Sequence, residues 1–180
     1  MNRKLTLVLF VLVTITFGTI YVATQQLLRM SANDPQIQMA QDAATELNTG
    51  VKPSNVSFGY VNIDSSLATF INVYNKNGNA VAGNGFTSSG LATPPIGVIK
   101  DAGGKTYSAI TWEPKSGVRQ AVVSVASNDY YVVSGRSLTE IEKRENNMLG
   151  FAAIGWLASC IVILAASDLS PIKSANTKKK

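Results

Sequence analysis

Residues 106–135 read "TYSAITWEPKSGVRQAVVSVASNDYYVVSG" and carry a clear strand pattern. Three runs rich in β-branched and aromatic residues, "TYSAITWE", "VRQAVVSVA" and "YYVVSG", follow one another. Only "PKSG" and "SND" separate them, and connections this short join neighbouring antiparallel strands. The stretch therefore predicts three consecutive strands of one antiparallel sheet.

A hairpin is predicted upstream, in "ATFINVYNKNGNAVAG" (68–83). Asn77 and Gly78 form a strong turn dipeptide because both residues tolerate positive φ. Another strand is expected in "VSFGYVNI" (56–63). The sheet then has about five strands, and the fold class is α+β.

Two stretches between these strands differ in amino-acid composition. "GNGFTSSGLATPP" (83–95) holds too many Gly and Ser residues to predict an element. "PIGVIKDAGG" (95–104) predicts a short helix, with Pro at its entry and Gly at its exit.

A long N-terminal helix is expected before the sheet. The first apolar run continues through "TQQLLRMSA" (24–32), and "NDPQIQMAQDAATELNTG" (33–50) is expected to restart the helix. Asn33 or Asp34 can cap it, Pro35 suits its first position, and Gly50 suits its exit. An apolar stripe predicts packing against a sheet or a partner helix; its members are Ile37, Ala40, Ala44 and Leu47.

Both ends of the chain are apolar enough to cross a bilayer. No charged residue occurs at 5–22 or at 148–167, and about 20 helical residues span the hydrocarbon core. We expect transmembrane helices at 5–23 and 148–167. The first could instead be a cleaved signal peptide, but its apolar run is long and Tyr21 stands where a cleavage site needs a small residue.

The charges predict the orientation of the chain. Of the net charge of +5, residues 1–4 contribute +2, residues 24–147 contribute zero and residues 168–180 contribute +3. Basic residues flanking membrane helices stay in the cytoplasm. We therefore expect a two-pass protein of the cell membrane, with a cytoplasmic N-terminus, an extracytoplasmic domain at 24–147 and a basic cytoplasmic tail. The lipid bilayer accounts for this charge pattern, and nucleic acid is not an expected partner.

The segment "SLTEIEKRENNMLG" (137–150) links the last strand to the second apolar run. Ser137 and Glu140 have the spacing of a capping box, which starts a helix. No Pro or Gly follows before Gly150, so one helix is expected from Ser137 through the membrane, with Ile141 and Met148 on one seam. Such a helix fits a signal-relay element and a plain stalk equally well.

In this order, the elements resemble the Cache/PAS-like extracytoplasmic sensor modules of bacterial two-component histidine kinases. The similar pieces are "TPPIGVIKDA" (93–102), "TWEPKSGVRQAVV" (111–123), "VVSGRSLTEIEKREN" (132–146) and "LSPIK" (169–173). The resemblance implies a PAS/Cache-like fold, a small-molecule ligand held against the sheet, a homodimer and signal transduction to a histidine kinase. The chain has no His and no nucleotide-binding motif, so the kinase would be a separate or missing output partner.

The residue inventory argues against an enzyme. Without His, the commonest general base and zinc ligand are absent, and the single Cys lies in the second apolar run. The acids Asp64, Asp101, Glu113 and Asp129 are scattered near turns without a spacing that pairs them. We expect no catalytic residues, no metal and no cofactor.

Ligand-binding candidates lie on the β-rich half, where Arg can hold a carboxylate and aromatic rings can form walls. Each also has a structural interpretation, as core packing or as a surface charge. The candidates are Tyr74, Tyr107, Trp112, Arg119, Tyr130 and Arg136.

Three function classes stay open, and the least favoured is a hydrolase of envelope substrates, which would require a paired-carboxylate cleft between strands. The first is a membrane-anchored sensor module that relays a conformational change through the second membrane helix. The alternative is a non-signalling envelope scaffold or assembly protein with the same fold. A truncated or split kinase would also give this pattern.

Overall fold

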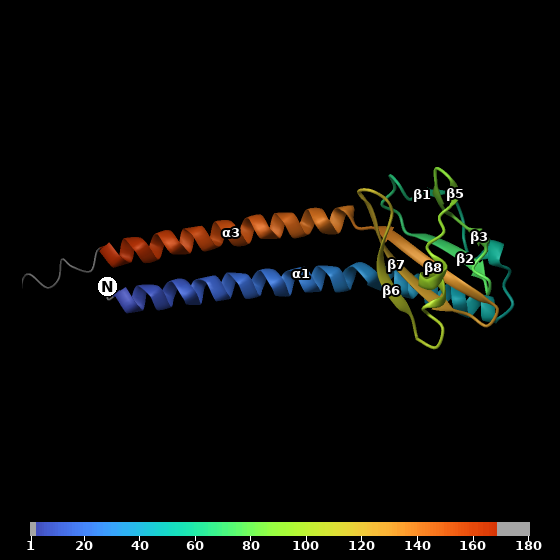
Figure 1. The fold of residues 1–180 in the computed structure, drawn as a ribbon, viewed down its shortest axis with the longest axis horizontal. Coiled ribbons are helices and arrows are strands. Elements are labelled where there is room, and N and C mark those ends of the chain that lie inside the picture. Colours follow the sequence, from blue (N-terminus) through green and yellow to red (C-terminus); the bar gives the residue numbers. More distant parts are fainter. Residues whose placement is uncertain (1–2, 169–180) are drawn as a thin grey trace, which may run out of the picture. The chain divides into compact units, whose positions relative to one another are not determined.

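The computed structural model describes residues 3–168, which form two units. One unit is the domain at 29–142, and the other consists of the helical segments 3–28 and 143–168. Of the predicted tail at 168–180, Asp168 is described, and residues 169–180, with the "LSPIK" similarity at 169–173, lie outside the described residues. Figure 1 shows the order of the elements along the chain.

The domain is built around the predicted five-stranded sheet, which is antiparallel throughout. The strand order is β3-β2-β8-β7-β6. The predicted hairpin is confirmed: the Asn75 side chain accepts hydrogen bonds from the N–H groups of Asn77 and Asn79, both at 3.0 Å, and Gly78 has φ 87°. The strands are β2 (Phe70–Asn75), β3 (Ala80–Gly83), β6 (Ser108–Lys115), β7 (Val118–Ala126) and β8 (Tyr130–Ser137).

A second, three-stranded sheet was not predicted. It consists of β1 (Val61–Asn62), β4 (Gly85–Thr87) and β5 (Gly90–Leu91), in the order β1-β4-β5. The strand expected at 56–63 is therefore wrong except for its last residues, and the stretch at 83–95, expected to be irregular, contains two short strands.

Two buried Asn side chains attach this small sheet to the large one. The Asn72 amide donates to the carbonyls of Gly85 (3.1 Å) and Ala92 (2.8 Å) and accepts from the N–H of Gly85 (3.0 Å). The Asn84 side chain accepts from the N–H of Ile71 at 2.8 Å. These side-chain bonds hold a stretch whose Gly and Ser content disfavours strands.

The N-terminal helix is longer and more continuous than expected. α1 (Arg3–Asn48) is one helix with Pro35 inside it, so the predicted restart at residues 33–35 is wrong. An internal Pro costs about 3 kcal/mol because it removes a helical hydrogen bond. Burial of the helix face that follows Pro35 offsets this cost. The predicted stripe is confirmed, since Ala40, Ala44 and Leu47 are buried and Ile37 packs beside them.

The large sheet separates two apolar cores. Alternate residues of its central strands face either α1 or the small sheet and α2 (Ile96–Lys100). On the α1 face the sheet contributes Ile71, Val73, Val123, Val125 and Val132. On the other face Phe70, Tyr74, Val122 and Val133 pack with Ile63, Ala92 and Ile99. A single turn of 3₁₀ helix, η1 (Pro53–Asn55), connects α1 to the sheet region.

The last helix, α3 (Thr139–Asp168), begins two residues later than predicted. Ser137 is the last residue of β8. Its hydroxyl accepts a hydrogen bond from the N–H of Thr139 at 3.3 Å, and not from the N–H of Glu140 as a capping box requires. The first helical bond runs from the N–H of Glu142 to the carbonyl of Leu138 at 2.9 Å. The capping box is therefore wrong, because Ser137 remains in the strand.

The apolar segments form their own unit. α1 and α3 each contain a stretch long and apolar enough to cross a membrane, by length and composition. Trp156 Nε1 donates to the Thr14 hydroxyl at 3.0 Å. A Cβ at Gly155 would lie 2.5 Å from the ring of Phe17, so a larger residue at this position would have to displace that ring. The orientation of the termini remains a prediction.

Candidate functional site

The six predicted ligand residues do not converge on one site. Tyr74 belongs to the core on the α2 face of the sheet, and Trp112 packs at the edge of that core. Tyr130 packs against the opposite core, under α1. Tyr107 directly precedes β6 and is 40% exposed. A single small ligand could not contact all of these positions.

Tyr74 has a structural role. Its side chain is fully buried, and its hydroxyl donates to the carbonyl of Ala92 at 2.5 Å. Burial raises the pKa of Tyr74 to about 12, because the phenolate form would lose its hydration. The ring fills the space between the sheet and α2, where Phe70, Ile99 and Val133 are also fully buried.

The two Arg candidates hold parts of the domain together. Arg136 Nε donates to the carbonyl of Leu67 at 3.2 Å. Arg119, on β7, forms an ion pair with Glu142 of α3. The carbonyl of Arg119 also accepts from the N–H of Leu138 at 2.9 Å. β7 is therefore bonded to the start of α3 through both backbone and side chain.

Of the six candidates, Trp112 lines a cavity of about 490 Å³, which we call the Trp112 cavity. This volume is within the usual range for small-molecule sites. Its wall comes from the β4–β5 hairpin, the segment before α2 and the end of β6. The lining residues are Asp64, Thr87, Ser88, Ser89, Leu91, Thr93, Pro95, Trp112, Glu113, Pro114 and Lys115.

Asp64 stands out in this wall. Its Oδ1 atom is shielded from water and has no hydrogen-bond partner among the residues that the structure describes. Leaving a buried acceptor unpaired costs about 1–3 kcal/mol, and more for a charged group. Glu113, in the same wall, accepts from the N–H of Gly117 at 2.8 Å through Oε1.

The sequence reasoning missed this constellation. Asp64 follows β1 and Glu113 lies on β6, and the β4–β5 hairpin, which the sequence did not predict, completes the wall of the cavity that they share. The run Thr87-Ser88-Ser89 was the available signal, because consecutive hydroxyls on a hairpin supply hydrogen-bonding groups. The other turn acid that has partners, Asp101, is structural: hydrogen bonds from Lys105 and Ser108 hold its pKa below the usual value.

The Trp112 cavity lies one short turn along the chain from the α3 attachment. Glu113 and Lys115 line the cavity at the end of β6, and β7 begins at Val118. The next residue, Arg119, makes the contacts with Leu138 and Glu142. A displacement of the β6–β7 hairpin would therefore be transmitted directly to the start of α3.

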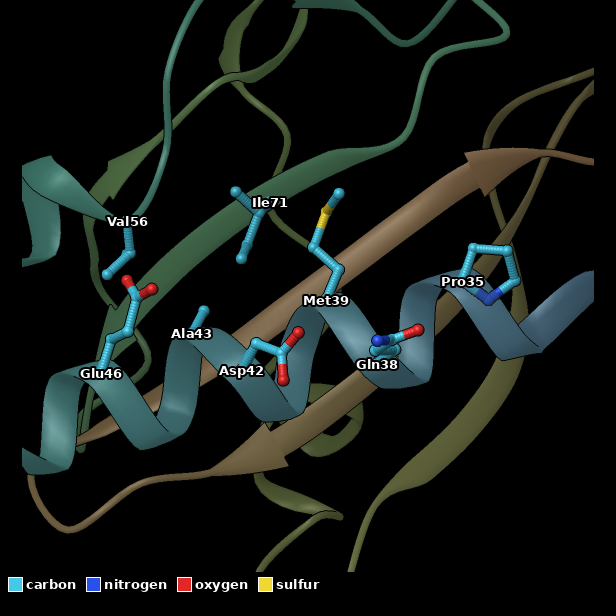
Figure 2. A pocket seen from close by; sticks show the side chains of 8 residues that line it. All are labelled: Pro35, Gln38, Met39, Asp42, Ala43, Glu46, Val56 and Ile71. Atoms are coloured by element: carbon cyan, nitrogen blue, oxygen red, sulfur yellow. The ribbon is translucent and has the colours of Figure 1, made fainter.

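A second concave feature is a groove of about 380 Å³ between α1 and β2. Figure 2 shows Met39 pointing toward Ile71 and Glu46 toward Val56 across this groove. Asp42 and Glu46 are exposed one turn apart, and no basic side chain within residues 3–168 pairs with them. The remaining lining residues are Pro35, Gln38 and Ala43.

The predicted relay residues are divided between the two units. Glu140 and Ile141 occupy the first turn of α3 within the domain, and Ile141 is half-buried. Met148 lies in the apolar unit and is 42% exposed. No group of three or more metal-ligating side chains occurs among residues 3–168.

No protein-family model, curated protein or solved structure matches the chain.

Proposed function

We propose that this protein is a membrane-anchored extracytoplasmic sensor, the signal-input module of a receptor. A small ligand would bind the domain, and the change would pass through α3 to a separate histidine kinase. In this proposal both termini are cytoplasmic, and the domain at 24–147 lies outside the cell membrane. Homodimerisation through the membrane-proximal helices is part of the proposal.

The continuity of α3 carries this proposal. One helix runs from Thr139, two residues after β8, to Asp168, without a Pro or a chain break. Its start is tied to β7 by the ion pair between Arg119 and Glu142 and by the bond from Leu138 to the carbonyl of Arg119. A helix transmits a rotation or translation along its length, so a shift of β7 would reach the membrane segment.

A chimera tests the proposal. Residues 1–168 are fused to the transmitter of a histidine kinase with a measurable output, and one to seven alanines are inserted after Asn147. Each insertion rotates the following helix by about 100°. If α3 relays the signal, the output should oscillate with the number of insertions and return near its starting level after about seven, which is close to two turns.

Charge reversals provide the matched control. Arg119→Glu should change the output, and Arg119→Glu with Glu142→Arg should restore it, whereas Lys52→Glu on the exposed loop after α1 should have no effect. A constant output across all insertions and reversals would contradict signalling. Purification with wall-synthesis or secretion components, and without a histidine kinase, would then favour the scaffold alternative.

A further inference from the structure

We propose that the Trp112 cavity is a sugar-binding site that takes a neutral, polyhydroxylated ring. The role of this site as the sensor input rests on the proposed function, but the binding itself does not. The ligand class follows from the charge, hydrogen-bonding groups and aromatic surface of the cavity wall.

The charges of the wall favour a neutral ligand. Asp64 and Glu113 contribute negative charge and Lys115 contributes positive charge around the same cavity. An anion would meet two carboxylates, and a cation would meet the ammonium group as well as the carboxylates. A hydroxyl-bearing ligand without net charge can bind groups of both signs without a repulsion.

The hydrogen-bonding groups favour a ligand with several hydroxyls. Ionised carboxylates only accept hydrogen bonds, whereas Ser and Thr hydroxyls both donate and accept. No donor within residues 3–168 reaches the Oδ1 atom of Asp64. The terminal torsion of an Asp side chain is soft, so a small rotation can turn this oxygen toward a hydroxyl in the cavity. Ser88 and Thr93 lie in the same wall and can bind further hydroxyls.

The apolar part of the wall favours a ring. The face of an indole is negative, which attracts the partially positive C–H groups on one face of a sugar ring. Trp112 supplies this surface, and Pro95, Pro114 and Leu91 supply the remaining apolar contacts. A combination of one aromatic face with convergent polar groups is typical of selective small-molecule sites.

The position of the cavity gives the site a mechanical connection. A ring stacked on Trp112 would press on the end of β6, and Lys115 pairs with Val118 across the β6–β7 turn. Arg119 follows Val118 and holds α3 through Glu142 and Leu138. Sugar binding would therefore exert a force on α3, the helix that relays the signal in the proposed function.

Titration of the full-length protein in lipid nanodiscs tests the site. The chain has two Trp residues, Trp112 and Trp156, so the Trp156→Phe variant makes Trp112 the only indole reporter. Glucose, galactose, N-acetylglucosamine and a soluble cellotetraose are titrated to about 10 mM, where a site with a Kd of about 1 mM is about 90% occupied. We expect a saturable change in Trp112 emission with at least one of them. Binding of cellotetraose alone would indicate a polymeric source, and binding of a monosaccharide would indicate a free sugar.

Calorimetric titrations of variants locate the binding. Asp64→Asn keeps the side-chain shape but removes the charge, and should weaken binding about 10-fold or more. Glu113→Gln is a second variant that does not depend on Asp64. Asp129→Asn, on an exposed turn outside the cavity, should bind as the unsubstituted protein does.

Three results would overturn the inference. The first is no response to any of the sugars, and the second is that the Asp64→Asn and Glu113→Gln variants both bind sugar as tightly as the unsubstituted protein. The third is a response to methylammonium or acetate in place of sugars. Sugar binding combined with a constant output in the alanine-insertion chimeras would leave the site standing and contradict only the sensor function.

Discussion

Gln36 is a buried amide without a hydrogen-bond partner. Its side chain is fully buried on α1, and neither Nε2 nor Oε1 has a partner within residues 3–168. We predict that Gln36→Met, which keeps the length of the side chain, raises the free energy of unfolding by about 1–3 kcal/mol by removing this desolvated amide. Chemical denaturation of the full chain in detergent, followed by near-UV circular dichroism, measures the change.

Gln38→Met is the matched control, because Gln38 is exposed on the same helix two residues away. Surface substitutions of this kind change stability by about 0.5 kcal/mol or less. Lower stability of the Gln36→Met variant would mean that the amide has a partner in solution.

Single residues also set the limit of the sequence predictions for the site. Of the six ligand candidates, Trp112 lies at a cavity, whereas Tyr74 and both Arg residues have partners within the fold. Aromatic and basic residues are common in cores and ion pairs, so residue type alone does not separate these roles. Asp64 becomes notable only once its burial is known, because an acid near a turn is usually solvated or bonded to local backbone.

At the scale of elements, the last turn of α1 is electrostatically unfavourable. It contains no basic residue, and Glu46 lies one turn after Asp42 on the same exposed side. Like charges at this spacing repel, and a negative charge near a helix C-terminus opposes the helix dipole. We predict that Glu46→Lys raises the free energy of unfolding by about 0.5–1.5 kcal/mol, measured by thermal unfolding at low salt.

Glu46→Gln separates the two contributions, since it removes the repulsion without adding an attraction, and should give a smaller gain. Added salt should reduce both gains. A loss of stability in the Glu46→Lys variant would show that the carboxylate of Glu46 has a favourable partner that the groove in Figure 2 does not reveal.

The elements that the sequence predicted are those with strong local patterns. The three strands between residues 106 and 135, the Asn77-Gly78 turn, the short helix after Pro95 and the apolar stripe of α1 depend on periodicity and turn chemistry. The small sheet depends on amide contacts between residues more than ten positions apart, such as Asn72 with Gly85. No local pattern reports such contacts, which is why β4 and β5 were missed.

At the scale of the whole molecule, the two apolar helices and the charge distribution predict a defined membrane topology. Cys160 is the only Cys of the chain, so Cys160→Ser gives a background for labelling. We predict that a membrane-impermeant maleimide labels Ser116→Cys, on the exposed β6–β7 turn, in intact cells. A Cys placed at either terminus should react only after lysis, because positively charged flanks stay inside.

Labelling of a terminal Cys in intact cells would contradict the two-pass orientation. Protection of Ser116→Cys until lysis would contradict it independently, and would place the domain in the cytoplasm. Denatured protein, in which every Cys reacts, provides the reference for full labelling.

The amide of Asn72 makes the domain sensitive to a one-atom chemical change. An Asn72→Asp substitution, which replaces the amide nitrogen by oxygen, would direct a carboxylate at the carbonyl oxygens of Gly85 and Ala92, which now accept from the amide. Oxygen would then face oxygen in a position that water does not reach. A single nitrogen atom therefore supplies two of the hydrogen bonds that attach the small sheet to the large one.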